Sequence, residues 1–159
     1  MAGSQCQDFG GNVEAFEKKV RDSFGRQSFM STIGAEMVSV GRGTVEIRFS
    51  FSTKLTQQNG FVHAGAVTSI MDSACGYSAL SVAPEDADVL SVEFKVNFLS
   101  PAIGESFVAR ESVKRVGKRL AVCAADAFAV RTGEEKLIAT MLATIMNTDS
   151  RPSGADSRG

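Results

Sequence analysis

The fold of this chain is best indicated by residues 55–80, which read LTQQNGFVHAGAVTSIMDSACGYSAL. An amide- and glycine-rich loop runs through His63, the only histidine, directly into an apolar helix expected over 65–82. That helix carries a single carboxylate, Asp72, on a stripe of small side chains. Loop amides, an imidazole, a helix N-terminus and a semi-buried acid together indicate a site for attack on a carbonyl group.

The elements on either side of this helix complete the predicted fold. A helix and two strands precede it, and four strands follow it, at 13–24, 33–40, 43–51, 89–99, 105–116, 119–132 and 135–147. Short turns at Gly117-Lys118 and Gly133-Glu134 predict that the last three strands form an antiparallel meander. The sequence therefore predicts an α+β fold, in which a curled antiparallel sheet wraps around one long central helix.

Length and composition indicate a single domain. The 159 residues divide into a domain over 12–148 and two small, polar tails, 1–11 and 149–159, which we expect to be flexible. The net charge of −1 gives no field that would draw nucleic acid, and no apolar run is long enough to span a membrane. The three cysteines have no metal-ligand or CxxC spacing, and the N-terminus has no signal pattern, so we expect a cytoplasmic protein without metal.

Two of the predicted strands have no polar face. Small residues alternate with large apolar ones over 119–132, and large apolar residues occupy both faces of 135–147. Because a strand with one wet face alternates apolar and polar residues, both faces of these strands are expected to be covered. We predict that a second subunit covers the outer face and that the protein is a homo-oligomer, with a tetramer favoured over a dimer. The alternative is that a terminal helix covers this face.

The spacing of His63 and Asp72 limits how they can cooperate. If one helix held both, nine positions would separate them by about 13–14 Å along the axis and turn them to opposite sides. Either His63 lies in the loop and bends back, or His63 of one subunit meets Asp72 of another. The covered outer faces favour a site at a subunit interface.

The start of the helix supplies a second element of the chemistry. A helix N-terminus carries roughly half a positive charge and up to four free N–H groups, which at Ala64-Gly65 could stabilise an oxyanion. Asp72 is a better candidate base than His63, because a lone histidine is more often structural. The only histidine and the absence of a GxSxG motif argue against a Ser-His-Asp triad.

The pattern resembles the hotdog-fold acyl-CoA thioesterases of the phenylacetate-degradation type, a group that includes the 4-hydroxybenzoyl-CoA thioesterases. The family signature is an amide residue, a short glycine-containing loop, His-Gly-Gly, and an acid nine residues after the histidine. Here it corresponds to Gln57, Gly60, His63-Ala64-Gly65 and Asp72. The segment from Ser91 to Ala102 resembles the next strand of the family. One departure is Ala64 in place of the first glycine, which keeps the N–H but loses access to positive φ and adds a methyl group.

The resemblance implies a role for each site residue. The N–H of Ala64 or Gly65 would hold the thioester carbonyl with help from Gln57, and Asp72 of the partner subunit would act as general base or as nucleophile. His63 would position the loop or the thioester, and Ser91 would orient the attacking water. Coenzyme A would be part of the substrate, so no separate cofactor is implied. Its phosphates would need a basic patch, and the best candidate is the cluster of Lys114, Arg115, Lys118 and Arg119 on one turn, which could equally be a solvated turn.

Two other functions remain open. A hotdog hydratase or dehydratase would place its histidine and acid against the α and β carbons of an enoyl or hydroxyacyl thioester. A binding module would keep the fold without turnover, and Ala64 is the best support for that reading. The nine-residue offset and the upstream amide favour hydrolysis of an acyl- or aryl-CoA thioester to the free acid and coenzyme A.

Overall fold

The computed structural model describes residues 10–149. Its elements, in chain order, are α1 (Gly10–Gly25), α2 (Ser28–Thr32), β1 (Ala35–Gly41), β2 (Thr44–Ser50), the 3-10 turn η1 (Thr53–Leu55), α3 (Ala64–Val82), β3 (Ala87–Phe98), β4 (Ser106–Val116), β5 (Leu120–Arg131) and β6 (Glu134–Asp149). The short helix α2 was not predicted from the sequence. Helix α1 begins at Gly10, inside the predicted tail 1–11, because helical backbone extends further upstream than the apolar stripe. Residues 1–9 and 150–159, the rest of both predicted tails, lie outside the described residues.

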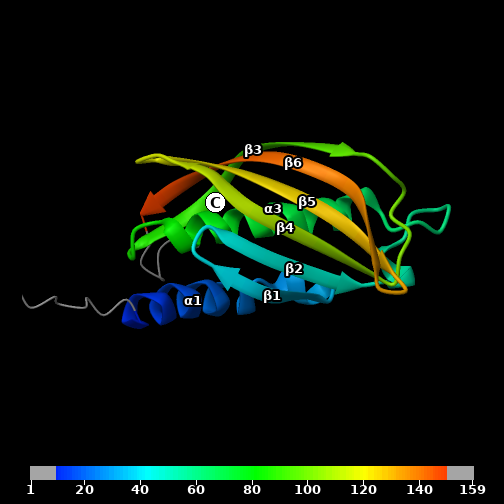
Figure 1. Cartoon of the computed structure of the whole chain (residues 1–159), viewed down its shortest axis with the longest axis horizontal. Helices are drawn as coiled ribbons and strands as arrows, with labels where there is room; N and C mark the ends of the chain where they lie inside the picture. Colours follow the sequence, from blue (N-terminus) through cyan, green and yellow to red (C-terminus); the bar gives the residue numbers. More distant parts are fainter. Residues whose placement is uncertain (1–9, 150–159) are drawn as a thin grey trace, which may run out of the picture.

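The strands form one antiparallel sheet in the order β1-β2-β4-β5-β6-β3. Consecutive strands β4, β5 and β6 are neighbours, which confirms the predicted meander. The chain leaves β2, passes through the loop and α3, and returns as β3 on the far edge of the sheet. Figure 1 shows this sheet curled around α3. The predicted α+β architecture is therefore confirmed.

Helix α3 forms the centre of the core. Twelve of its 19 residues are buried, among them Val67, Ile70 and Met71. The side chains of β5 that face the helix are all small and all buried, namely Ala121, Cys123, Ala125, Ala127 and Ala129. Small side chains on this face let the sheet approach the helix closely, because every second residue of a strand points to the same side. The helix ends at Val82, two residues before Pro84, as the backbone restriction before proline favours.

Helix α1 does not cover the outer face of the sheet. It packs against α3 and β1, on the side of the molecule away from β5 and β6 (Figure 1). The alternative that a terminal helix covers the outer face is therefore wrong for the part of the chain that the structure describes. The apolar side chains of Leu120, Leu137, Leu142 and Met146 are exposed there.

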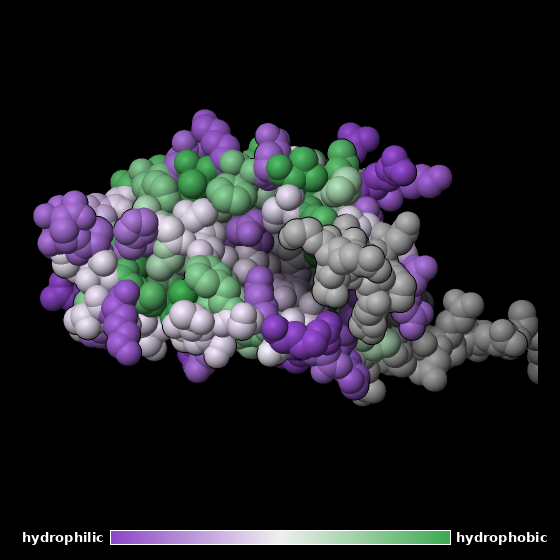
Figure 2. Space-filling model, turned by 180° about the vertical axis from the view of Figure 1, so that it is seen from behind, coloured by the Kyte–Doolittle hydropathy of each residue, from purple (hydrophilic) through white to green (hydrophobic). Residues whose placement is uncertain are grey.

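Strand β3 is an exposed edge. It pairs only with β6, so its other edge has no partner strand among the described residues. Most of its residues are exposed, including the large apolar side chains Leu90, Val92, Phe94 and Phe98. Figure 2 shows hydrophobic surface gathered along the upper border of the molecule, where β3 and β6 lie in Figure 1. A long, apolar, unpaired edge of this kind favours pairing with another strand.

One carboxylate lies inside the core. Glu111 on β4 is only 5% exposed, and neither of its oxygens has a hydrogen-bond partner among the described residues. Burial raises the pKa of Glu111 to about 8. Ser78 lies nearby, but its hydroxyl donates to the carbonyl oxygen of Cys75 at 3.0 Å. This carboxyl group is therefore protonated over much of the range in which an exposed glutamate is ionised.

Candidate active site

The loop that precedes α3 is closed by backbone hydrogen bonds. The N–H of Gln57 donates to the carbonyl of Phe61 at 2.8 Å, and the N–H of His63 donates to the carbonyl of Leu55 at 2.8 Å. Gly60 lies between these contacts with φ = +84°, a conformation that favours glycine. The amide oxygen of Gln57 accepts a hydrogen bond from the N–H of Asn59. The loop therefore holds Gln57 and His63 in fixed positions at the start of the helix.

His63 is the N-cap of α3. Its Nδ1 accepts a hydrogen bond from the N–H of Gly65 at 2.8 Å. A Cβ atom at Gly65 would lie 2.9 Å from that nitrogen, which explains why a glycine stands at this position. Because the cap engages Nδ1 as an acceptor, His63 holds the loop against the helix, and only Nε2 is left to interact with a ligand.

Ala64 carries the free N–H of this helix start. The N–H of Gly65 donates to His63 and that of Ala66 donates to the His63 carbonyl, whereas the N–H of Ala64 has no acceptor among the described residues. Ala64 is the first residue of the helix and is exposed. Thr132 is the only non-glycine residue of the described chain with positive φ, so the loss of that conformation at Ala64 has no cost. The donor that can reach a ligand is thus Ala64 rather than Gly65.

A pocket of about 470 Å³ lies beside this donor. Gln57 and Ala64 both line it, so the structure brings together two residues that the resemblance assigns to one carbonyl; their roles stay predictions. The other lining residues are mostly apolar and include Phe61 of the loop, Val67 of α3 and Phe98 at the end of β3; the rest come from the same loop, from the segment after β3 and from β6.

Asp72 and Ser91 lie together elsewhere. The Ser91 hydroxyl on β3 donates to Oδ1 of Asp72 at 2.6 Å. Both residues line a separate pocket of about 310 Å³, which contains no residue of the loop. The sequence placed these two residues in one site, and the structure brings them into contact. The roles proposed for them remain predictions.

The loop and the carboxylate do not meet within one protomer. Asp72 lies eight residues after Ala64 on the same helix, or about 12 Å along its axis. The two residues line different pockets. One protomer therefore contains two half-sites, an N–H donor with an amide, and a carboxylate with a hydroxyl.

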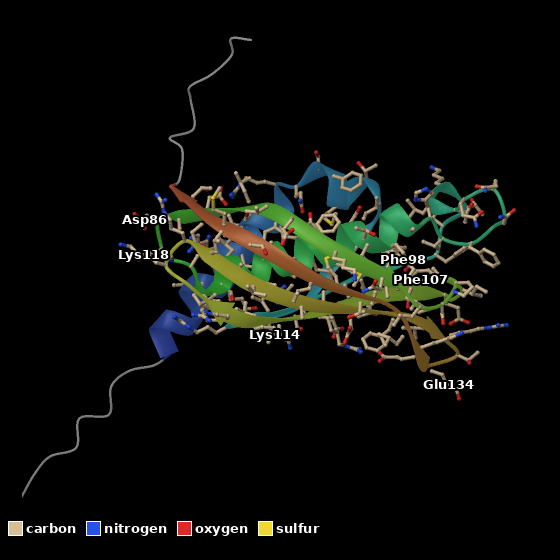
Figure 3. The ribbon with its side chains drawn as sticks, turned by 90° about the horizontal axis from the view of Figure 1, so that it is seen from above. Asp86, Phe98, Phe107, Lys114, Lys118 and Glu134 are labelled. Carbon is tan, nitrogen blue, oxygen red and sulfur yellow. The ribbon has the colours of Figure 1, made fainter. Side chains whose placement is uncertain are left out.

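The predicted basic patch lies at the other end of the molecule. Arg115, Lys118 and Arg119 line a shallow pocket of about 320 Å³ on the β4–β5 turn. Figure 3 shows Lys118 at the same end of the molecule as Asp86, far from Phe98, which lines the Gln57 pocket. Within one protomer this patch therefore cannot serve a ligand held by Ala64.

Sequence reasoning missed one residue near Asp72. Gln27, between α1 and α2, lines the Asp72 pocket, and its Oε1 accepts hydrogen bonds from Ser73 at 3.4 Å and Tyr77 at 3.5 Å. No local pattern signals this position, because only tertiary packing brings the first two helices against α3.

The fold and the two half-sites define a class. An antiparallel sheet curled around one helix, with a histidine-capped loop and a carboxylate two turns into that helix, is typical of hotdog thioester-processing proteins. Within the described residues, no helix is long and apolar enough to cross a membrane.

Comparison with known proteins agrees with this class. Residues 59–136 match the thioesterase superfamily. A thioesterase family protein from Silicibacter pomeroyi, known from a crystal structure, is 51% identical in sequence to this chain. The match covers 84% of this chain and 98% of the relative, and the two structures superimpose with a TM-score of 0.83. A relative from Saccharolobus solfataricus, named provisionally as an esterase, is 31% identical over 79% of this chain and 81% of its own length. The PaaI protein of the E. coli phenylacetic acid degradation operon shares the fold, with a TM-score of 0.77 at 15% identity, over 87% of this chain and 96% of its own.

The chain belongs to the thioesterase superfamily. The resemblance to hotdog thioesterases is confirmed, and the protein is a thioester hydrolase that acts on a small-molecule thioester. This assignment favours hydrolysis over the binding-module and hydratase alternatives.

Proposed function

We propose that the protein is an acyl-CoA thioesterase whose active site is completed by two protomers. The observation that carries this proposal is that the free N–H of Ala64 and the carboxylate of Asp72 line different pockets of one chain. Both groups can act on one thioester carbonyl only if the loop of one protomer faces Asp72 of another.

The N–H of Ala64 acts on the carbonyl oxygen. It has no acceptor within residues 10–149, is exposed and lies at the positive end of a 19-residue helix, so it stabilises the negative charge that develops there on attack. Gln57 lines the same pocket and can donate its amide N–H to the substrate, since its oxygen is engaged by Asn59. His63 maintains the geometry by capping the helix.

Asp72 acts on the carbonyl carbon, by one of two routes. As a general base it takes a proton from water as the water oxygen bonds to the carbon; the C–S bond then breaks, and the proton passes to the leaving thiolate. As a nucleophile it forms an anhydride with release of coenzyme A, and water then hydrolyses that anhydride. Ser91 holds Oδ1 by its hydroxyl, which leaves Oδ2 for either route. Neither route uses a metal or a separate cofactor.

The exposed edge of β3 supports the pairing of protomers. Two such edges can pair antiparallel, which would extend the sheet across both protomers and bury Leu90, Val92 and Phe94. In that arrangement the turn bearing Arg115, Lys118 and Arg119 would approach the loop end of the other protomer, where it could bind the phosphates of coenzyme A. The exposed apolar residues of β5 and β6 are the surface on which two such dimers would form a tetramer.

Three variants test the proposal by release of free thiol from a panel of acyl-CoA substrates. Ala64→Pro removes the free N–H at the first helical position, where proline is tolerated, and His63 already has the extended backbone that a following proline requires (φ −63°, ψ 136°). We expect kcat of Ala64→Pro to fall about 10²–10³-fold. Ala64→Gly keeps the N–H and is the matched control. Asp72→Asn should abolish turnover.

Mixing distinguishes a shared site from one within a single chain. Hybrid dimers of Ala64→Pro and Asp72→Asn subunits contain one intact site, so co-expression should restore about a quarter of the wild-type activity. If the mixture stays as inactive as its parents, although hybrids form, the shared site is refuted. If Ala64→Pro retains full activity, Ala64 is not the oxyanion donor.

A further inference from the structure

The pocket around Asp72 extends beyond the carboxylate toward the N-terminal helices. Its walls include Ser23 and Gln27 from the α1–α2 segment, Tyr77 from α3 and Asp88 from the start of β3. Phe24 packs edge-on against Tyr77, with ring centroids 5.6 Å apart, and so joins α1 to this wall. A substituent on a carbonyl group bound at Asp72 would enter this pocket. Its volume of about 310 Å³ lies at the lower end of the usual range for ligand sites.

The polar groups in this pocket are loosely paired. Ser73 and Tyr77 are both buried, and each donates to Oε1 of Gln27 at distances of 3.4 and 3.5 Å. Hydroxyl donors usually lie about 2.7–2.8 Å from their acceptors, so these bonds are weak. The side-chain NH₂ of Gln27 donates to no described residue. Ser23 also hydrogen-bonds the Tyr77 hydroxyl. The weak bonds to Gln27 and its free amide donor are nevertheless suited to a polar atom of a ligand.

The charges around the pocket limit what that polar atom can be. Asp72 and Asp88 both line it, whereas the nearest cations, Lys19 beside Asp88 and Arg26 beside Tyr77, do not. Oδ1 of Asp88 accepts the adjacent N–H of Val89. A second carboxylate on the ligand would lie against these two acids. A neutral hydroxyl group avoids this repulsion, and it can accept from Gln27 and donate to an acid or to Ser23.

We propose that this pocket binds the acyl group of the thioester, and that Gln27 makes it selective for acyl groups that carry a hydroxyl group remote from the thioester. This inference rests on the proposed function, since it takes the reacting carbonyl to lie at Asp72. The Asp72 pocket is bounded by α1. The sulfur side of the thioester must instead lead outward, because it continues into the rest of coenzyme A. Ser73 and Tyr77 lie about 1.5 and 7.5 Å beyond Asp72 along the helix axis. An extended acyl chain spans about 1.2 Å per bond, so a hydroxyl group of the ligand that lies level with Tyr77 is about six bonds from the carbonyl carbon.

Paired substrates of equal size provide the test. In 6-hydroxyhexanoyl-CoA the oxygen is six bonds from the carbonyl carbon, and heptanoyl-CoA has a methyl group in its place. We expect wild-type kcat/KM to be about tenfold higher for the hydroxylated substrate, the effect of one or two good hydrogen bonds. Gln27→Leu should remove this preference, and Tyr77→Phe, which keeps the ring beside Phe24, should reduce it. Ser31→Ala, an exposed position on α2, is the control and should leave the ratio unchanged.

The outcomes separate this inference from the proposed function. Equal kcat/KM for the two substrates in the wild type, or a ratio that survives in both Gln27→Leu and Tyr77→Phe, would overturn the inference while thioesterase activity stands. If neither thioester releases thiol, the proposed function fails. Thermal stabilisation by 6-hydroxyhexanoate and heptanoate then decides the pocket chemistry: stronger stabilisation by the hydroxy acid that is lost in Gln27→Leu upholds it, and equal stabilisation overturns it.

Discussion

The buried carboxyl group of Glu111 predicts an unusual dependence of stability on pH. Its pKa is raised by burial from the ordinary 4.5 to about 8 in the folded protein. Above about pH 4.5 the unfolded chain releases this proton, whereas the folded protein keeps it until about pH 8. The contribution of Glu111 to stability is therefore fully present below pH 4.5 and is lost as the pH rises toward 8.

The size of the effect follows from the two pKa values. Each pH unit between them costs about 1.4 kcal/mol of the free energy of unfolding, and the whole interval costs about 5 kcal/mol. Glu111→Gln has nearly the same shape and cannot ionise, so it should lack this slope. Relative to the wild type, the variant should therefore be least stable at low pH. Its relative stability should rise with pH, so that it becomes the more stable protein as the pH approaches 8.

Urea unfolding at a series of pH values between about 5 and 8, at one fixed protein concentration, measures this difference. Glu134→Gln, on the exposed β5–β6 turn (Figure 3), is the control and should parallel the wild type. The groups that face Glu111, namely Cys75, Cys123 and Lys114, are common to all three proteins. A constant difference between Glu111→Gln and wild type across this range would refute the reasoning, because it would mean that Glu111 ionises alike in the folded and unfolded chain.

Three further substitutions test contacts described above. Gly65→Ala places a Cβ 2.9 Å from Nδ1 of His63, so it should disrupt the cap and cost about 1 kcal/mol of stability together with most of the activity; an unchanged melting temperature and kcat would contradict this. Lys19→Met removes an ammonium group that donates to the carbonyls of Pro84, Glu85 and Ala87 at 3.1, 2.8 and 2.7 Å, and should lower the free energy of unfolding by about 1–3 kcal/mol. Ser91→Ala removes the 2.6 Å contact with Asp72 and should lower kcat about tenfold or more with little change in stability, which thiol release and thermal melting together would measure.

The sequence predicted those parts of the fold that depend on local pattern. The apolar run after His63 and the turns at Gly117 and Gly133 are local signals, and α3 and the meander lie where these signals indicated. The five-residue helix α2 is too short to carry a periodic signal, and α1 extends past its apolar stripe to Gly10.

The candidate site was predictable to a similar degree. Motif spacing singled out Gln57, His63 and Asp72 as candidates, whose roles stay predictions, and the contact between Ser91 and Asp72 agrees with the expected strand. Spacing alone left Ala64 and Gly65 as equal donors, because the choice depends on where the His63 ring turns. Gln27 could not be found in this way, since its place beside Ser73 depends on how α1 and α2 pack against α3.

The open side of β3 has a consequence for the newly made chain. Along the 12 residues of β3, the N–H and C=O groups that point away from β6 have no partner strand among the described residues; beside Leu90, Val92 and Phe94 they form a template to which an extended polypeptide can add. Until the β3 edge pairs with the edge of its partner subunit, each chain is prone to aggregate through it. Yield of usable material should therefore depend on how fast chains are synthesised and how crowded they are, and slow, cool expression should favour it.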